Sequence, residues 1–422
     1  MREMKESNIS WVGKIPCNWK IEKNKHCFQL EKNIVGENKD KFELLSLTKK
    51  GIIKKDESGT GGKVPESFET YQSVKKGQLV MCLFDLDVSA VFSGLSNYDG
   101  MISPAYKVYN CNKIIDKNYA KYWFECCFDG RKYKAYSKSL RYVVNTEDFG
   151  TIEILLPPKE EQEKIAEFLD KKITEIDNVI EKTKETIEDY KRFKISIITE
   201  AVTKGLDKHA ETKDTGINWI DRIPKKWNVQ RIKDVASLKT GTTPSTQNQE
   251  WFDGDYNWFT PGDFNENYIM EKSIRKLSIQ AKLDNVATII PKDTTLIIGI
   301  GGTAGKIGFV ERECSCNQQI TAIISNKVVN KYIMYWMIAN TKFLKETAMY
   351  TTLPIINNET LGRYLFINPN STNEERLIVD YLDKKCSDID KLLLNKQSII
   401  EKLEQYKISL IYEYVTGKKE VV

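Results

Sequence analysis

The amino-acid sequence predicts a mixed α/β fold in which two mixed α/β domains are separated by two long helices that form an antiparallel coiled coil. Three observations support this prediction: the chain of 422 residues repeats one plan, each copy begins with strand-like segments, and each copy ends in a long amphipathic stretch. Two copies of one plan are expected to be related by a pseudo-twofold axis, and helices related in this way run antiparallel.

A rare tryptophan motif marks the internal repeat. Residues 9–19 and 217–227 share the pattern Trp-x-x-x-Ile-Pro-x-x-Trp. Residues 168–172 and 381–385 share the pattern aromatic-Leu-Asp-Lys-Lys, so that Leu169 and Leu382 are counterparts. The difference between these two residue numbers is the helix offset, and two residues separated by it are counterparts in the two long helices. Each half is therefore a variable region followed by a similar region, and the predicted boundaries are 1–157, 158–208, 209–368 and 369–422.

The two similar regions are predicted to be helices of about 45 residues, or about 66 Å in length. Their apolar residues mostly recur at steps of three and four and would form the seam of a coiled coil. Thr372 and Glu375 predict a capping box for the second helix, while Gly205 and Gly417 stand where the two helices end. An alternative is that each helix folds onto its own domain. The predicted seam residues are Leu169, Ile176, Ile180, Ile187, Leu382, Ile389, Leu393 and Ile400.

The two variable regions have alternating and β-branched segments bounded by Gly, Asn and Asp, which are typical of strands. The first region has predicted strands at 77–83 and 88–92 and a helix at 119–136. The second region has a predicted helix at 332–349 and predicted strands at 285–290, 294–298, 307–310 and 320–324.

Composition indicates an ordinary globular protein, because hydrophobic residues make up 41% and charged residues 29%, with no apolar run long enough for a membrane span. The net charge of +5 permits local basic surfaces without requiring a nucleic-acid partner. Nine cysteines include no C-x-x-C spacing, and residues 1–10 are not followed by the apolar stretch of a secretory signal. We therefore expect reduced thiols, no membrane and a cytoplasmic location.

Catalytic and cofactor motifs are missing from the sequence. His26 and His209 are the two histidines, too few for a histidine metal cluster. The glycine-rich stretch 299–306 fails the P-loop pattern, because Ile300 and Ile307 stand where Gly and Ser or Thr are needed, and it precedes a predicted strand rather than a helix. Such a stretch instead lets backbone approach a ligand closely.

Polar side chains that can bond base edges or phosphates lie near this glycine-rich stretch. An alternative for each of them is to cap a turn. The predicted DNA-binding residues of the second region are Thr242, Thr243, Ser245, Thr260, Gly302, Thr303, Lys306, Asn317, Gln318 and Gln319.

These motifs, in this order and duplicated, resemble the specificity (S) subunit of type I restriction-modification enzymes over nearly the whole chain. The resemblance rests on the tryptophan motif, the glycine loop with Asn-Gln-Gln after it, Lys-Thr-Gly-Thr-Thr-Pro-Ser at 239–245, Trp-Phe-Thr-Pro-Gly-Asp at 258–263, and the segments 155–162 and 165–170. The first region lacks the Thr-Pro-Ser segment, and 370–376 replaces the Pro-rich, Glu-Gln start of the helix.

The resemblance implies a non-catalytic subunit in which two target recognition domains each read one half of a bipartite double-stranded DNA site. The helices would set the spacing and dock methyltransferase (M) subunits, with two M subunits expected, alongside restriction and motor (R) subunits. S-adenosylmethionine, ATP and Mg would be bound by those partners, and this chain is expected to hold no cofactor, no metal and no catalytic residue.

For the first region, polar and basic residues flank turns between strand-like segments. Ser103, which precedes Pro104, has the alternative of shaping a turn, and Arg141 has the alternative of an ion pair. The predicted DNA-binding residues there are Ser46, Thr48, Lys49, Ser103, Arg141 and Tyr142.

Two other functions stay open at the level of sequence. A coiled-coil adaptor without specific DNA reading would keep the helices but leave the two variable regions without a role. A metal-dependent nuclease would use Asp85, Asp87 and Glu125.

Overall fold

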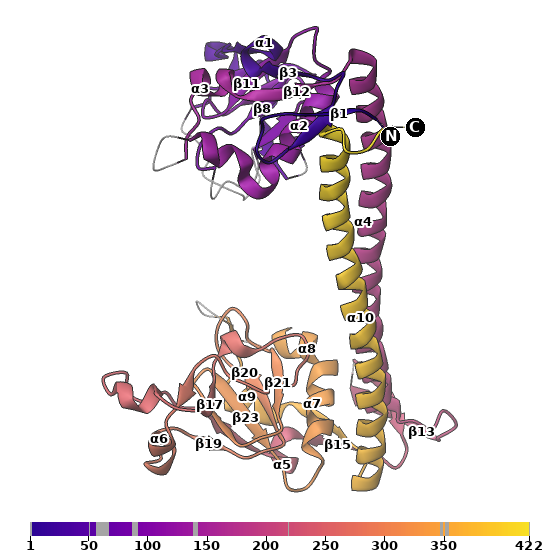
Figure 1. The fold of residues 1–422 in the computed structure, drawn as a ribbon. Helices are drawn as coiled ribbons and strands as arrows, with labels where there is room; N and C mark the ends of the chain where they lie inside the picture. Colours follow the sequence, from indigo (N-terminus) through magenta and orange to yellow (C-terminus); the bar gives the residue numbers. More distant parts are fainter. Residues whose placement is uncertain are drawn as a thin grey trace. The chain divides into compact units, whose positions relative to one another are not determined.

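Two long helices are the largest elements of the computed structural model, which describes residues 2–49, 51–55, 67–86, 92–137, 142–217, 219–346, 349–350 and 354–421. Helix α4 (Lys159–Lys204) has 46 residues and α10 (Thr372–Val415) has 44 (Figure 1). The predicted pair of long helices between mixed α/β regions is therefore confirmed. None of the described helices combines the length and the apolar character needed to cross a bilayer.

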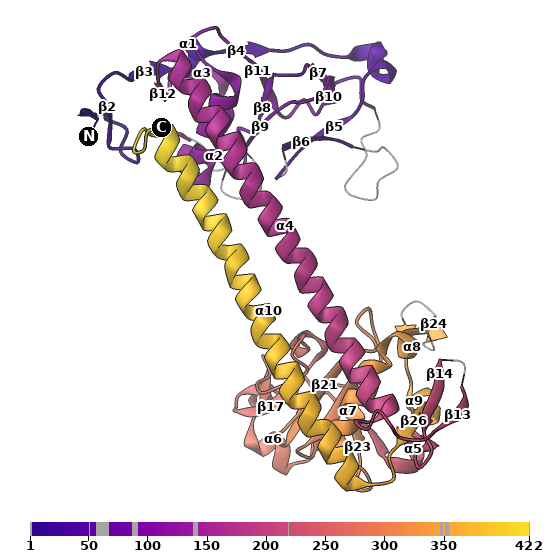
Figure 2. The same cartoon turned by 90° about the vertical axis from the view of Figure 1, so that its right-hand side faces the viewer.

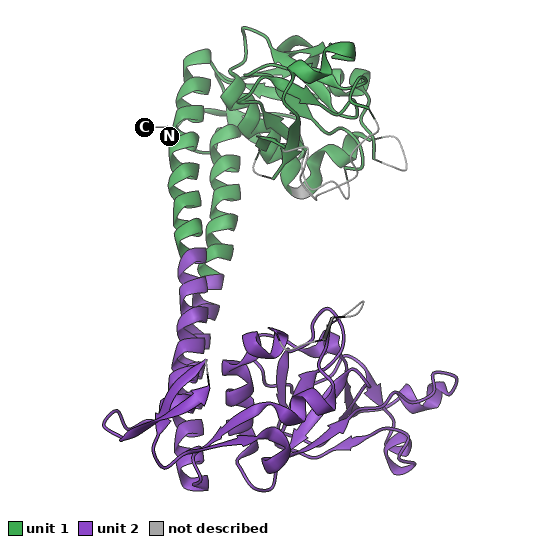
Figure 3. Ribbon diagram, turned by 180° about the vertical axis from the view of Figure 1, so that it is seen from behind, with its two compact units in different colours: residues 1–183, 398–422 green, residues 184–397 purple. Residues whose placement is uncertain are grey.

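The chain divides into two units, and each contains one variable region with parts of both long helices (Figure 3). Unit 1 is residues 1–183 with 398–422, and unit 2 is residues 184–397. Within each unit a stretch of α4 lies beside a stretch of α10 (Figure 2). In unit 1, Phe168 contacts Tyr414 and Asp177 contacts Lys407, so residue numbers fall along α10 as they rise along α4. The predicted antiparallel direction is confirmed.

The predicted seam residues are buried or half-buried on the two long helices, and Leu382 belongs to the core cluster of unit 2. Leu169, Ile176 and Ile180 of α4 are buried, and Ile187 is half-buried. In α10, Leu382, Ile389 and Ile400 are buried and Leu393 is half-buried.

Unit 1 is built on an antiparallel four-stranded sheet in the order β4-β11-β8-β9, with four two-stranded pairs around it (β1-β2, β3-β12, β5-β6 and β7-β10). Its strands are β1 (Met4–Glu6), β2 (Lys14–Pro16), β3 (Lys20–Lys23), β4 (Phe28–Glu31), β5 (Leu45–Thr48), β6 (Gly51–Lys54), β7 (Gln72–Val74), β8 (Leu79–Met81), β9 (Ser93–Leu95), β10 (Gly100–Ile102), β11 (Lys107–Cys111) and β12 (Glu153–Leu156). Its shorter helices are α1 (Asn24–Cys27), α2 (Lys117–Phe128) and α3 (Thr146–Thr151), with 3-10 turns at Gly36–Lys41 and Asp129–Tyr136.

Unit 2 has two four-stranded sheets, β16-β23-β20-β21 and β18-β17-β22-β19, with the β17–β22 pairing parallel. Its strands are β13 (Thr212–Ile217), β14 (Ile220–Pro224), β15 (Asn228–Arg231), β16 (Ser237–Thr240), β17 (Tyr256–Phe259), β18 (Lys276–Leu277), β19 (Ile289–Ile290), β20 (Thr294–Ile298), β21 (Ile307–Val310), β22 (Cys314–Cys316), β23 (Ile320–Ile324), β24 (Met349–Tyr350), β25 (Pro354–Ile355) and β26 (Leu365–Asn368). Its shorter helices are α5 (Ile232–Val235), α6 (Ile279–Leu283), α7 (Asn330–Ala339), α8 (Thr341–Glu346) and α9 (Asn358–Arg363).

Several predicted boundaries are wrong for local reasons. The predicted strand 285–290 shortens to β19, because Asn285 has a positive φ of 51° after α6. The predicted helix 332–349 breaks at Asn340, whose side-chain amide donates to Trp336 O at 2.8 Å and ends α7. The predicted helix 119–136 becomes α2 followed by a 3-10 turn. Within the predicted strand 88–92, only Phe92 lies among the described residues.

The tryptophan motif joins each domain to the first turn of a long helix. Trp19 is fully buried, and its ring N–H donates to Glu161 Oε2 at 3.1 Å. Trp227 in unit 2 donates in the same way to Glu374 Oε1 at 3.0 Å. Glu161 and Glu374 are related by the helix offset, so the contact repeats with the helices.

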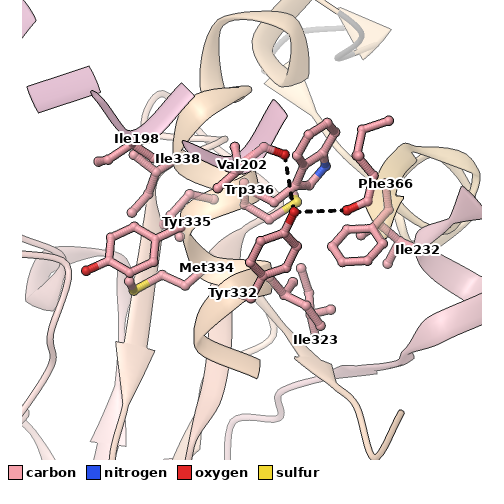
Figure 4. Close-up of a cluster of buried hydrophobic side chains, with 14 of the residues drawn as sticks. Ile198, Val202, Ile232, Ile323, Tyr332, Met334, Tyr335, Trp336, Ile338 and Phe366 are labelled. Carbon is pink, nitrogen blue, oxygen red and sulfur yellow. Dashed lines mark hydrogen bonds between the residues drawn. The ribbon is translucent and has the colours of Figure 1, made fainter. Parts of the chain in front are cut away.

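A buried tyrosine joins each domain to the end of the helix that comes from the other half of the sequence. Tyr332 Oη lies 3.2 Å from Val202 O of α4 and 3.2 Å from Ile367 O of β26 (Figure 4). Tyr119 Oη in unit 1 lies 3.2 Å from Val415 O of α10, and also 3.2 Å from Leu155 O of β12. Each domain core thus includes a helix end contributed by the other sequence half.

One buried polar position differs between the two copies. Gln162 uses its whole amide: Oε1 accepts from Asp116 N at 2.7 Å, and Nε2 donates to Ile114 O and Pro157 O at 3.0 and 2.9 Å. Glu375 is its counterpart by the helix offset, and Glu375 Oε2 accepts from Val329 N at 2.7 Å. Ser371, rather than a Thr372–Glu375 capping box, caps this helix end, with Ser371 Oγ accepting from Glu374 N.

We predict that Glu375→Gln stabilises unit 2 by about 0.5 to 1.5 kcal/mol near pH 8, the worth of one hydrogen bond. Burial raises the pKa of the Glu375 carboxyl above its ordinary 4.5. In the wild type, the protonated Glu375 carboxyl therefore makes its full contribution to the free energy of unfolding below pH 4.5. This contribution is lost as the pH rises through the folded-state pKa. The gain should appear in thermal unfolding at pH 8 and disappear near pH 4. The mirror variant Gln162→Glu should destabilise unit 1 at pH 8; equal gains at both pH values would contradict the explanation.

Candidate nucleic-acid interface

Three segments that are distant in the sequence meet at one end of the β16-β23-β20-β21 sheet of unit 2. They are residues 241–245 after β16, the loop 299–306 between β20 and β21, and the turn 317–319 between β22 and β23. Gly241 N donates to Ile320 O at 2.9 Å, Thr242 N donates to Cys316 O at 2.9 Å, and Gly299 N donates to Gln319 O at 2.7 Å. Backbone hydrogen bonds therefore hold the loops that carry most of the predicted DNA-binding residues.

Gly241 allows the closest of these approaches. A Cβ atom at this position would lie 2.3 Å from Cys316 O and 2.4 Å from Asn317 O. No side chain fits there, because the first segment runs directly against the turn after β22.

The glycine-rich loop connects the antiparallel strands β20 and β21 as a hairpin. The sequence predicts a strand rather than a helix after this loop, and the prediction is confirmed. Gly301 and Gly305 have φ values of 113° and 86°, which favour glycine. Ile356 N donates to Gly299 O at 2.7 Å, so the loop is also hydrogen-bonded to the segment before α9. Gly302 and Thr303 are exposed at its tip.

The Asn-Gln-Gln turn has one buried and two accessible side chains. Asn317 is buried; its Oδ1 accepts from Gln319 N at 3.1 Å, and its Nδ2 donates to Gln319 Oε1 at 3.1 Å. Gln318 is exposed, and its Oε1 accepts from Thr243 Oγ1. Within the described ranges no group accepts from Gln318 Nε2. Asn317 therefore orients Gln319, while Gln318 presents a free amide N–H to solvent.

Three of the predicted hydroxyl groups serve the scaffold. Thr242 Oγ1 accepts from Thr288 N at 2.8 Å, and Thr260 Oγ1 donates to Asp263 Oδ2 at 2.8 Å. Ser245 Oγ accepts from Gln247 N at 3.4 Å. These contacts fit the alternative in which hydroxyls cap turns, although Thr242 and Ser245 remain exposed.

Lys306 lies at the base of the loop and lines a cleft of about 810 Å³ between the domain and the helices of unit 2. Lys191, Lys194 and Lys342 line the same cleft. Lys191 is paired with Glu266 at 3.2 Å, and Lys194 with Asp390 at 2.7 Å. Lys306 and Lys342 make no ion pair with any residue that the structure describes.

The predicted residues of unit 1 are less concentrated. Ser46, Thr48 and Lys49 share the β5–β6 hairpin, where Thr48 Oγ1 donates to Gly51 O at 2.9 Å. Thr48 and exposed Lys49 line a cleft of about 970 Å³ in unit 1, together with Lys121, Glu125, Arg131, Asp170 and Lys407.

Two further predicted residues of unit 1 have structural contacts. Ser103 begins a turn, since its carbonyl oxygen accepts from Tyr106 N at 3.2 Å and from Gln72 Nε2 at 3.1 Å. Tyr142 has a positive φ of 45°, and Lys134 Nζ lies 4.0 Å from its ring centre. Arg141 lies outside the described residues.

The predicted helix residues are buried or half-buried, and sequence reasoning missed a second, exposed set on the same helices. Leu392, Ile399 and Tyr406 recur at heptad spacing on α10, which places them on one face. Val179 and Phe193 lie two heptads apart on α4. The sequence pattern that could have revealed this exposed set is the heptad spacing of apolar residues outside the predicted seam.

In the described ranges, no three His, Cys, Asp or Glu side chains come together as a metal site. This includes Asp85 and Glu125 of the nuclease alternative, while Asp87 lies outside the described residues.

Duplicated α/β domains on paired helices, with polar loops held at the end of a sheet, define a class of two-domain recognition proteins. Residues 95–189 and 224–405 match the family described as type I restriction modification DNA specificity domain, and the chain belongs to this family. One match lies in each half of the repeat.

Curated relatives agree with this assignment. The type I restriction enzyme MjaIX specificity subunit of Methanocaldococcus jannaschii is 31% identical over 205 residues, which are 47% of this chain and 45% of the relative. This chain thus spans about half the length of that relative. The MjaVIII specificity subunit of the same organism is 22% identical over 333 residues, 74% of this chain and 72% of the relative.

A solved structure shares the fold. A chain from a structure that concerns complex assembly and conformational transition of the type I R-M system superposes with a TM-score of 0.73 at 15% identity. The match covers 96% of this chain and 99% of the other.

We predict that Gly241→Ala destabilises unit 2 by about 1 to 3 kcal/mol, because its Cβ would overlap two carbonyl oxygens. Thermal unfolding measures the loss. Gly302→Ala is the matched control, since nothing lies within 4 Å of a Cβ there, and it should be close to neutral. A neutral Gly241→Ala would mean that the backbone contact of the first segment is not required.

Proposed function

We propose that this chain is the DNA sequence-recognition subunit of a type I restriction-modification complex, in which each unit reads one half of a bipartite double-stranded DNA site. The observation that carries the proposal is the convergence of three loops in unit 2, which present the exposed side chains of Gln318, Thr243 and Thr303 from a backbone fixed by hydrogen bonds. Rigid presentation of such groups is what direct reading of base edges needs.

Within unit 2, we assign different roles to the predicted residues. Gln318 and Gln319 are the base-reading candidates, because an amide can bond adenine at two atoms. Gln319 would exchange its contacts with Asn317 Nδ2 and Ile300 O for such bonds. Thr243 and Thr303 are exposed beside them, and Lys306 is placed to meet a phosphate. Thr242, Thr260 and Asn317 hold the loops, with Ser245 and Gly302 at their edges.

For unit 1 the hairpin residues Thr48 and Lys49 are the leading candidates, since they line a cleft that also contains Arg131. Arg131 Nη1 donates to Leu86 O at 2.8 Å, which fixes its guanidinium at the edge of the domain. Ser46, Ser103 and Tyr142 remain candidates that do not line this cleft, and Arg141 remains a candidate outside the described residues.

We further propose that two methyltransferase subunits dock on the exposed apolar residues of the helices. In unit 1, Val179 lies level with Tyr406, and in unit 2 Phe193 lies level with Leu392, given the antiparallel register of the ion pairs. Each pair is the counterpart of the other by the helix offset, so the chain offers two equivalent surfaces. Exposed apolar patches of this kind favour protein partners.

Catalysis in this proposal belongs to partners. S-adenosylmethionine would be bound by the methyltransferase subunits, and ATP with Mg by the restriction and motor subunits, with this chain itself non-catalytic and acting on DNA in the cytoplasm. An adaptor without DNA reading is less favoured, because it gives the rigid polar loops of unit 2 no role.

The proposal predicts that Gln318→Ala costs about 1 to 3 kcal/mol of binding and relaxes base preference at one position of one half-site. Methylome sequencing of cells carrying the variant complex measures this directly. Gln280→Ala removes an exposed amide on α6 of the same unit and should leave the motif unchanged. A uniform loss across all DNA sequences would contradict a base-reading role for Gln318, and a wild-type complex without a bipartite motif would refute the function.

The proposed docking surfaces predict that Tyr406→Asp and Phe193→Asp each weaken the affinity for one methyltransferase subunit roughly 10- to 100-fold. Each substitution removes about 1.5 to 3 kcal/mol of apolar burial. Mass measurement of the purified complex should give one methyltransferase per chain for each single variant and none for the double variant. Ile274→Asp is the control, because Ile274 is also exposed but lies outside the helices. Unchanged stoichiometry in the double variant would refute these docking surfaces.

A further inference from the structure

A lysine interrupts the apolar seam once in each unit. Lys194 follows Ile173, Ile180 and Ile187 of α4 at heptad steps, a spacing that keeps one side of a helix against its partner. Lys407 follows Leu393 and Ile400 of α10 in the same way. Lys194 and Lys407 are counterparts by the helix offset, so the interruption belongs to the internal repeat.

Each lysine meets an aspartate of the other helix. In unit 2, Lys194 Nζ lies 2.7 and 2.8 Å from the two carboxylate oxygens of Asp390, and its side chain is only 8% exposed. The ring of Tyr268 covers Lys194 with its centre 5.4 Å from Nζ. A nearly buried ammonium group requires such a partner, because its desolvation is costly.

The same contact occurs in unit 1. Lys407 Nζ lies 2.7 and 2.8 Å from the two carboxylate oxygens of Asp177. This pair is more open, with side-chain exposures of 30% and 52%. Asp177 and Asp390 are again related by the helix offset.

Both contacts belong to one register of the helices. In an antiparallel pair, the numbers of facing residues have a constant sum, and Lys194 with Asp390 gives the same sum as Lys407 with Asp177. One register therefore satisfies both pairs together.

A slip of one heptad loses the two pairs. In one direction Lys194 would stand level with Gln397 and Lys407 level with Lys184. In the other direction the lysines would stand level with Asp383 and Asp170. These carboxylates already accept from Tyr335 and Tyr122 at 2.6 Å, and Lys331 lies 2.8 Å from Asp383.

We propose that these two lysine–aspartate pairs fix the register of α4 against α10 and thereby act as positioning residues for the gap between the two half-sites. The part that concerns the gap rests on the proposed function. A charged residue in a coiled-coil seam lowers stability but selects one register, and this is the role that the geometry gives to Lys194 and Lys407.

The first test measures register in the isolated full chain, with Cys17→Ser removing the exposed native thiol. Cysteines at Ile187 and Gln397 are level in the native register, and cysteines at Ile187 and Glu404 are level after a one-heptad slip. A short bismaleimide crosslinks whichever pair is close. Lys194→Leu with Lys407→Leu gives a fully apolar seam that should fold, and it should raise the ratio of slipped to native crosslink at least about tenfold, or about 1.4 kcal/mol.

Charge exchange provides the rescue. Lys194→Asp with Lys407→Asp places like charges together and should lose the native crosslink or the fold. Adding Asp390→Lys and Asp177→Lys restores both pairs with reversed polarity and should recover the native crosslink. Lys172→Leu with Lys385→Leu is the matched control, because Lys172 pairs with Glu175 on its own helix, 2.9 Å away. An unchanged ratio in the leucine variant, or no recovery on charge exchange, overturns the proposal.

The second test reads the gap in the assembled complex. A slip of one heptad moves one helix by about 10.5 Å along the other, which corresponds to about three base pairs of duplex DNA. The leucine variant should therefore methylate sites whose gap is about three base pairs longer or shorter at a higher relative rate, with both half-site sequences unchanged, and charge exchange should restore the wild-type preference. A wild-type complex without a bipartite motif would refute the proposed function and leave the crosslinking result standing. A slipped register with an unchanged gap would refute only the link between register and gap.

Discussion

The antiparallel pairing of α4 with α10 is the constraint that every other part of this fold requires. Tyr119 of the first half is hydrogen-bonded to the end of α10, and Tyr332 of the second half is hydrogen-bonded to the end of α4. Unit 1 accordingly includes residues 398–422, and unit 2 begins within α4. Neither sequence half supplies a complete unit, because each domain core is closed by a helix end from the other half.

The two long helices present two different surfaces. The seam buries Leu169 and Leu382 and stabilises the pair, while Phe193 and Tyr406 remain more than half exposed. Buried apolar area explains why the helices associate, and the exposed residues related by the helix offset are the proposed docking surfaces. A lysine–aspartate pair in each unit adds direction and register to contacts that apolar packing alone would leave less specific.

The polar side chains in the loops of unit 2 fall into buried groups that hold the loops and exposed groups that we propose to read DNA. Asn317 is buried and orients Gln319, whereas Gln318 keeps a free amide N–H. Gly241 brings the first loop within reach of the turn, since any Cβ there would overlap its carbonyl oxygens. The unit 1 candidates share fewer contacts, in agreement with the absence of the Thr-Pro-Ser segment from that half.

Sequence reasoning alone recovers the internal repeat, the two long helices, their antiparallel direction and the strands at 294–298, 307–310 and 320–324. Periodicity is visible within one short segment, and the repeat is visible when the sequence is compared with itself. Once the helices are predicted, the need to bury their apolar faces leaves few ways to arrange them. The role of Glu375 depends on its contact with Val329, which is distant in the sequence, so periodicity could not predict it. The end of α7 at Asn340 and the shortening of the predicted strand 285–290 to β19 depend on single residues whose conformation periodicity does not record.

Which polar side chains are free becomes apparent only in the folded chain. Asn317 and Gln318 are neighbours of similar chemistry, yet one is buried and the other exposed, because backbone bonds from distant residues such as Thr242 and Phe259 fix the turn. The register of the helices likewise depends on side chains 196 and 230 residues apart, Lys194 with Asp390 and Lys407 with Asp177. Such contacts carry no local sequence signal, since each exists only after the chain has folded.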